Sequence, residues 1–202
     1  FDARLRPMID PPLNAIGVRL ANAGISANMV TVSGFCLGLL AAVSIAFGYF
    51  LAGFVLIGLN RLFDGLDGAV ARASQKTDLG GYLDITLDFF FYGAIPLAFA
   101  IQAPETNALP AAALLASFYA NGSAFLAFAI MAEKRNLSTN HQGAKSLYYI
   151  GGLAEGTETI GLFLLMALLP AWFPVLAWAF AGVCLVSASA RVLIGLRALK
   201  DR

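Results

Sequence analysis

Four aspartates stand in two closely spaced pairs within an otherwise apolar sequence. Asp64 and Asp67 are three residues apart, and Asp84 and Asp88 are four residues apart. On an α-helix, both spacings bring the two carboxylates of a pair to the same face. The connection between the two pairs is short, so their helices are expected to be antiparallel neighbours. We therefore predict that all four carboxylates meet at one level.

A cluster of this kind requires cations. An aspartate at the centre of a membrane-spanning helix costs about 2.5–3.5 kcal/mol on insertion scales. Arg61, one turn before Asp64, can offset only one of the four charges. Ligation by carboxylate oxygens alone favours hard ions such as Mg²⁺ or Mn²⁺. Two such ions about 3.5–4 Å apart can clamp the attacking and leaving oxygens of a phosphoryl displacement. We therefore predict two divalent cations, Mg²⁺ or Mn²⁺, as cofactors.

Small residues accompany the first aspartate pair. They leave one helix face without bulk, so that a diphosphate or a nucleobase can approach the backbone closely. Helices also pack against one another through small residues, which is the alternative explanation. The adjacent aspartates favour a ligand site. The small residues are Gly65, Gly68, Ala69 and Ala71.

The composition indicates a membrane protein. Of 202 residues, 59% are hydrophobic and 12% are charged, whereas a soluble domain has about 25% charged residues. A chain this apolar belongs in a bilayer. The formal net charge of +1 gives no indication of a nucleic-acid partner, and we expect none.

Six segments are long and apolar enough to cross a membrane as helices. We expect an all-α integral membrane fold with one domain over 1–202, in which an interfacial segment, 1–25, precedes a six-helix catalytic bundle, 26–202. The interfacial segment mixes apolar and charged residues and is expected to form an amphipathic surface helix, interrupted at Pro11 and Pro12. A disordered tail is the alternative. The segment 1–25 lacks the apolar core of a signal peptide, so we expect no cleavable signal peptide. The predicted spans are roughly 30–49, 51–71, 82–101, 109–131, 153–169 and 173–193.

The basic residues predict the orientation. The connections after the first, third and fifth spans, at 48–53, 102–108 and 170–174, contain no Lys or Arg. Nearly all 13 basic residues fall in the terminal segments and in the connections after the second and fourth spans. Because basic segments stay in the cytoplasm, we expect both termini and the active site to be cytoplasmic. We expect the protein to reside in a bacterial inner membrane.

The motif around the aspartates resembles the signature of the CDP-alcohol phosphotransferase family. It fixes eight residue types across two helices and reads here Asp64-x2-Asp67-Gly68-x2-Ala71-Arg72-x7-Gly80-x3-Asp84-x3-Asp88. Further upstream, Asn28 and Thr31 match part of the family's Pro-Asn-x-x-Thr segment, with Ala27 in place of the proline. The six-helix arrangement with an N-terminal surface helix also agrees with the family.

The resemblance implies particular roles for these residues. Asp64, Asp67 and Asp84 would ligate metal, and Asp88 would ligate metal or act as the general base on the acceptor hydroxyl. Helix capping is the alternative role of the upstream Asn and Thr. A homodimer is also implied. The residues expected at the CDP moiety are Gly68, Ala71, Arg72, Gly80, Asn28 and Thr31.

The acceptor alcohol is expected near the same level, among the fourth, fifth and sixth spans. Lys145 and Arg191 could bind an acidic group. Glu155 and Glu158 would instead suit an acceptor with hydroxyls or an amine. The two glutamates could also pair with the two basic residues, or complement a helix N-terminus. The single histidine, His141, is expected to be a solvated loop residue.

These features together predict a membrane enzyme that transfers a phosphatidyl group from CDP-diacylglycerol to an alcohol and releases CMP, as in phospholipid synthesis. One alternative is transfer from a soluble CDP-alcohol, such as CDP-choline, to a lipid alcohol. A more distant one is an ion or proton transporter that uses the aspartates as a relay. A relay would distribute charges across the bilayer, whereas here they cluster at one side.

Overall fold

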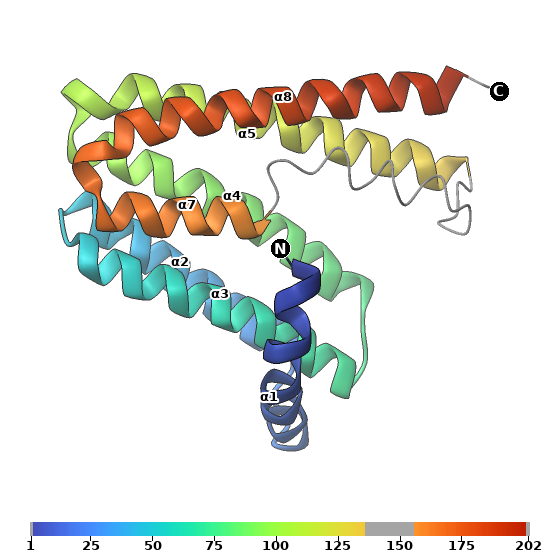
Figure 1. Cartoon of the computed structure of the whole chain (residues 1–202). Coiled ribbons are helices and arrows are strands. Elements are labelled where there is room, and N and C mark those ends of the chain that lie inside the picture. The colour runs from blue at the N-terminus through green and yellow to red at the C-terminus, as the bar shows by residue number, and fades with distance from the viewer. Residues whose placement is uncertain (1, 136–155, 201–202) are drawn as a thin grey trace.

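The computed structural model describes residues 2–135 and 156–200, which form helices joined by short connections, with no strand in these two ranges. The path of the chain is shown in Figure 1. The elements are α1 (Asp2–Asn22), α2 (Ala27–Ala46), α3 (Phe50–Ala73), α4 (Asp78–Gln102), α5 (Pro104–Lys134), α7 (Gly156–Leu168), the 3₁₀ turn η1 (Pro170–Trp172) and α8 (Phe173–Lys200).

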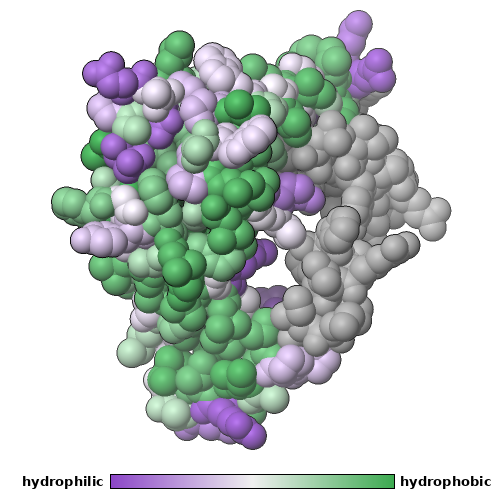
Figure 2. Space-filling model, turned by 60° about the vertical axis from the view of Figure 1, so that its left-hand side comes forward, coloured by the Kyte–Doolittle hydropathy of each residue, from purple (hydrophilic) through white to green (hydrophobic). Residues whose placement is uncertain are grey.

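Four of the described helices are long and apolar enough to cross a membrane. They are α2, α4, α5 and the continuous segment Pro170–Lys200. Their outer surfaces carry many exposed large apolar side chains, among them Leu40, Leu97 and Leu109. Apolar residues likewise dominate the coloured part of Figure 2. Because lipid tails solvate such side chains, the chain is an integral membrane protein whose described residues are helical.

The helices are arranged around α4. Antiparallel α2 and α3 form one pair and α5 and α8 another, while α4 and α7 lie between the two pairs (Figure 1). Aromatic rings fill the space between them. Phe99 of α4 stacks on Phe173 of α8 with a centroid distance of 4.4 Å, and Phe91 meets Phe163 of α7 edge-on at 6.0 Å. This core fixes α4 and therefore the depth of the aspartates that it carries.

Helix α2 packs closely against α3 and α4, the two helices that carry the aspartate motif. A Cβ atom on Gly38 would lie 2.6 Å from the Phe91 ring and 3.1 Å from the Asn60 amide nitrogen. The buried Asn60 side chain donates a hydrogen bond of 2.9 Å to the carbonyl oxygen of Gly34. Only glycine leaves room for this approach. As a result, the start of α2 lies beside the aspartates of α3.

The N-terminal helix packs against α3. Leu13 is buried with Leu66, Ala69 and Val70. A Cβ atom on Gly17 would lie 2.7 Å from the Ala69 carbonyl carbon, so the two backbones almost touch. In Figure 1, α1 crosses the α2–α3 pair instead of running along it.

The predicted interruption at Pro11 and Pro12 is wrong, because α1 continues from Asp2 to Asn22 as one helix. A proline removes one helical hydrogen bond, but its φ angle is already close to the helical value, so a helix can accommodate it by bending. The structure therefore gives an N-terminal helix without the predicted break.

Two helices begin earlier than predicted from the apolar runs. In α4, the Thr77 side chain accepts a hydrogen bond of 3.0 Å from the Gly80 amide, which starts the helix at Asp78 instead of 82. In α5, Pro104 occupies the first turn, so the helix starts there instead of at 109. Proline suits this position because its missing N–H would have no helical partner. Polar end turns extend these helices beyond the apolar run.

Candidate active site

The predicted carboxylate cluster is present at the junction of α3 and α4. Carboxylate oxygens of Asp64, Asp84 and Asp88 all lie within 4.8 Å of one another, a grouping that can hold a metal ion. Asp67 joins Asp64, Asp84 and Asp88 in lining a cavity of about 10 Å³. That volume is about the room needed by one water molecule. The prediction that α3 and α4 pack along each other is not borne out, since α2 packs against both of them, and the four carboxylates meet beside α2.

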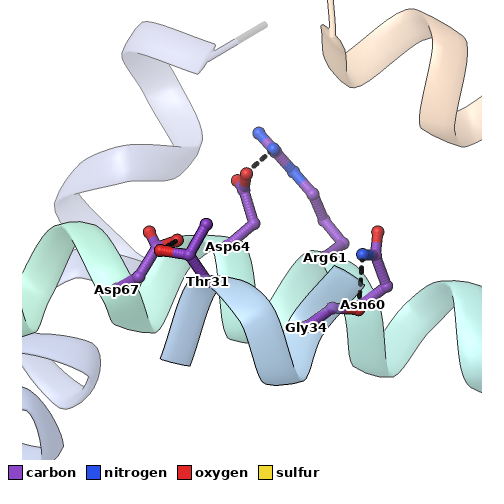
Figure 3. Close-up of polar contacts among 6 residues, drawn as sticks. All are labelled: Thr31, Gly34, Asn60, Arg61, Asp64 and Asp67. Atoms are coloured by element: carbon purple, nitrogen blue, oxygen red, sulfur yellow. Dashed lines mark hydrogen bonds and ion pairs between the residues drawn. The ribbon is translucent and has the colours of Figure 1, made fainter. Parts of the chain in front are cut away.

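Two of the aspartates have protein partners, which are shown in Figure 3. Arg61 forms an ion pair with Asp64 one turn away on α3, as the sequence indicated. The Thr31 hydroxyl of α2 donates a hydrogen bond of 2.7 Å to Oδ2 of Asp67. One oxygen of Asp67 is therefore held by α2, while Asp84 and Asp88 come from α4. Three helices contribute to the site.

Helix capping does not explain Asn28 and Thr31. The N-cap of α2 is Ser26, whose side chain accepts a hydrogen bond of 3.3 Å from the Met29 amide. Thr31 lies further inside the helix and contacts Asp67 instead. The capping alternative is therefore wrong for both residues.

A second, larger pocket of about 300 Å³ adjoins the acidic cluster. Thr31, Asp67 and Asp84 line both this pocket and the small cavity, so the two spaces meet at these three side chains. The pocket brings together every residue that the sequence assigned to the CDP moiety, which are Asn28, Thr31, Gly68, Ala71, Arg72 and Gly80.

Five further residues of this pocket were not predicted to line it, among them Ala27 and Gly81. The other three, Gln75, Lys76 and Thr77, lie between the two halves of the motif. Their position in the sequence could have identified them, since a connection between two helices that bind a ligand lies close to that ligand. A side chain at Gly80 would crowd Asn28, because a Cβ atom there would lie 3.1 Å from Oδ1 of Asn28.

The predicted acceptor residues are separated in the described structure. Arg191 lines a cavity of about 670 Å³ between α4, α5, α7 and α8, and its guanidinium lies 5.1 Å from the centroid of the Phe125 ring. Glu158 is exposed in the first turn of α7 and is not among the described residues that line this cavity. Lys145, Glu155 and His141 lie outside the described residues.

Known proteins resemble this chain over most of its length. The profile of the CDP-alcohol phosphatidyltransferase family matches residues 24–193. The Inner membrane protein YnjF of Escherichia coli (strain K12) is 48% identical over 201 residues, which cover 100% of this chain and 98% of that protein.

Two archaeal relatives are similar over a little less than half of the chain. The Archaetidylinositol phosphate synthase of Pyrococcus horikoshii is 37% identical over 43% of this chain and 46% of its own. The protein of the same name from Methanothermobacter thermautotrophicus is 36% identical over 46% of each chain. The motif, the paired pockets and these matches agree, and the chain belongs to the CDP-alcohol phosphatidyltransferase family of membrane transferases.

Proposed function

We propose that this enzyme transfers a phosphatidyl group from CDP-diacylglycerol to an alcohol acceptor and releases CMP. The observation that supports this most is the shared wall between the acidic cavity and the larger pocket, formed by Thr31, Asp67 and Asp84. A nucleotide in the larger pocket would have its diphosphate at the carboxylates. The reacting phosphorus and the charged groups would then be neighbours.

The carboxylates fit divalent cations. Asp64, Asp84 and Asp88 offer three oxygens at ligating separation, and Asp67 keeps one oxygen free of Thr31. Oxygen-only donors suit Mg²⁺ or Mn²⁺, and two ions are proposed. When bound, the ions would neutralise charge on the diphosphate oxygens.

Asp88 is proposed as the general base. The acceptor hydroxyl oxygen forms a bond to the lipid-bearing phosphorus, and its proton passes to the Asp88 carboxylate. The bond from that phosphorus to the bridging oxygen breaks, and CMP leaves with the bonding electrons. Asn28, Gly68, Ala71, Arg72 and Gly80 are proposed to hold the CDP group throughout.

The reverse layout, with a soluble CDP-alcohol donor and a lipid alcohol acceptor, is the second candidate. Either layout joins a lipid and an alcohol through a phosphate, so the two candidates differ only in which substrate carries the CDP group. A proton relay is disfavoured because the aspartates gather at one level of α3 and α4.

An acceptor screen tests this function directly. Purified protein in detergent, supplied with Mg²⁺ and CDP-diacylglycerol, should release CMP with at least one member of a panel of polar alcohols and alcohol phosphates. CDP-choline with diacylglycerol should give no CMP. Release only from the soluble donor would establish the reverse layout, and release from neither would reject both.

We also propose that α3 and α7 complete six spans, with both termini and the site in the cytoplasm. Lys76 precedes α4 and Glu105 follows it, so these two exposed residues lie at opposite ends of one candidate span and can report its orientation. The family resemblance supports a homodimer, a single catalytic domain over 1–202 and an interfacial position for α1.

Single-cysteine labelling tests this topology. Cys36 is exposed and Cys184 is buried, so both are first replaced. A membrane-impermeant maleimide added to intact spheroplasts should label Glu105→Cys and should label Lys76→Cys only after permeabilisation. Labelling of both cysteines in intact spheroplasts would reject the proposed topology. Labelling of Lys76→Cys alone would show that the protein has the opposite orientation.

A further inference from the structure

The exposed Arg72 side chain is held by the N-terminal helix at the edge of the larger pocket. On one side, Oδ1 of Asn14 accepts hydrogen bonds from Nε and Nη2 of Arg72, at 3.2 and 2.9 Å. On the other side, a Cβ atom on Gly68 would lie 3.3 Å from Nη1 of Arg72. The guanidinium is therefore anchored to the N-terminal helix by Asn14, and its Nη1 atom lies near the position that a side chain on Gly68 would occupy.

Packing of α1 fixes the position of Asn14. Its neighbour Leu13 is buried, and a Cβ atom on Gly65 would lie 3.0 Å from Cδ1 of that leucine. One turn later, Gly17 lies against Ala69. These contacts flank Asn14 along α1, so its side chain is presented to Arg72 by a docked helix. The contact joins residues 58 apart in the sequence.

Confinement of an arginine matters for binding an anion. A free arginine loses rotamer entropy when it grips a ligand, and both its stem and its planar head must be ordered. Asn14 is neutral, so it orders the guanidinium without cancelling its charge. The Nη1 atom is not used by Asn14, which leaves donor capacity for a second partner.

We propose that Asn14 is a positioning residue that pre-organises Arg72 to bind the diphosphate of the CDP donor. This inference rests on the proposed function, because it takes the larger pocket as the nucleotide site. It assigns α1 a part in substrate binding in addition to its place against α3. The matched control is Asn22, an exposed asparagine at the C-terminal end of the same helix.

The test is calorimetric titration of CDP into the detergent-solubilised full chain with Mn²⁺ present. Asn14→Ala should raise the Kd for CDP by about 3- to 10-fold, whereas Asn22→Ala should change it less than about twofold. In an Arg72→Ala background, Asn14→Ala should have almost no further effect, because a residue that acts through Arg72 is not additive with its loss. In turnover, Asn14→Ala should raise the KM for the CDP donor and leave kcat near wild type.

Two results would overturn the inference. One is an unchanged Kd for Asn14→Ala. The other is a full additional loss in the Arg72→Ala background, which would show that Asn14 acts on folding or on another group. Asn14→Leu, which removes the acceptor at similar volume, repeats the test if the alanine variant unfolds. Wild-type protein that does not bind CDP would reject the proposed function as well, whereas normal wild-type binding with an inert Asn14 would reject only this inference.

Discussion

Removal of divalent cations should abolish CMP release, and addition of Mg²⁺ or Mn²⁺ should restore it. Three carboxylates whose oxygens lie within 4.8 Å repel one another and the donor diphosphate unless cations lie between them. Arg61 is committed to Asp64 and can neutralise only that charge. We expect turnover in excess EDTA to fall by at least about 100-fold, because a metal ion supplies several kcal/mol at a reacting phosphoryl group.

The measurement is CMP release by EDTA-treated protein before and after metal is added back. A parallel titration of Mn²⁺ by calorimetry should show tight binding by wild-type protein and weaker binding by Asp64→Ala. Asp78→Asn is the control, since Asp78 lies in the first turn of α4 away from the cluster. Undiminished CMP release in EDTA would refute metal catalysis by these residues.

Replacement of Asp88 should separate proton removal from metal binding. Asp88→Asn retains size and one ligating oxygen but cannot accept the proton. If Asp88 is the base, turnover should fall by about 10²–10⁴-fold, with metal and CDP-lipid still bound. Asp67→Asn disturbs the carboxylate that Thr31 orients. It should weaken metal binding, and excess Mg²⁺ should recover part of its activity.

Both turnover and metal affinity are needed, because loss of a ligand can resemble loss of a base in rate alone. Calorimetric Mn²⁺ titration of the two variants provides the second quantity, and Asp78→Asn again serves as control. Recovery of Asp88→Asn by metal as complete as that of Asp67→Asn would make Asp88 mainly a ligand. The proton would then leave through water or another carboxylate. Glu158 is a poor candidate, since it does not line the acidic cavity.

The sequence was sufficient to predict the aspartate cluster. The short connection does not make α3 and α4 pack along each other, because α2 packs against both. A spacing of three or four residues on a helix nevertheless determines which side chains share a face, and this is a local property. For the same reason, the Arg61–Asp64 ion pair could be predicted from the sequence alone. The apolar runs likewise predicted α2, α4, α5 and α8 as candidate spans.

The helix ends and the course of α1 were predicted less well. Apolar runs mark only the part of a helix that lies in lipid, so they do not predict the early starts of α4 and α5 at Asp78 and Pro104. The double proline predicts a break, whereas α1 continues through it while packed against α3. Local propensity is a weak guide where tertiary contacts hold an element in place.

Only the tertiary structure determined the contacts between residues far apart in the chain. Thr31 reaches Asp67 across 36 positions, and Asn14 reaches Arg72 across 58. Neither pair has a spacing rule, because each depends on how closely two helices approach. The glycines at 17 and 38 permit that approach, yet in the sequence they resemble any other small residue. Side-chain chemistry and helical period therefore determined which groups act, whereas backbone-to-backbone packing decided which partners orient them.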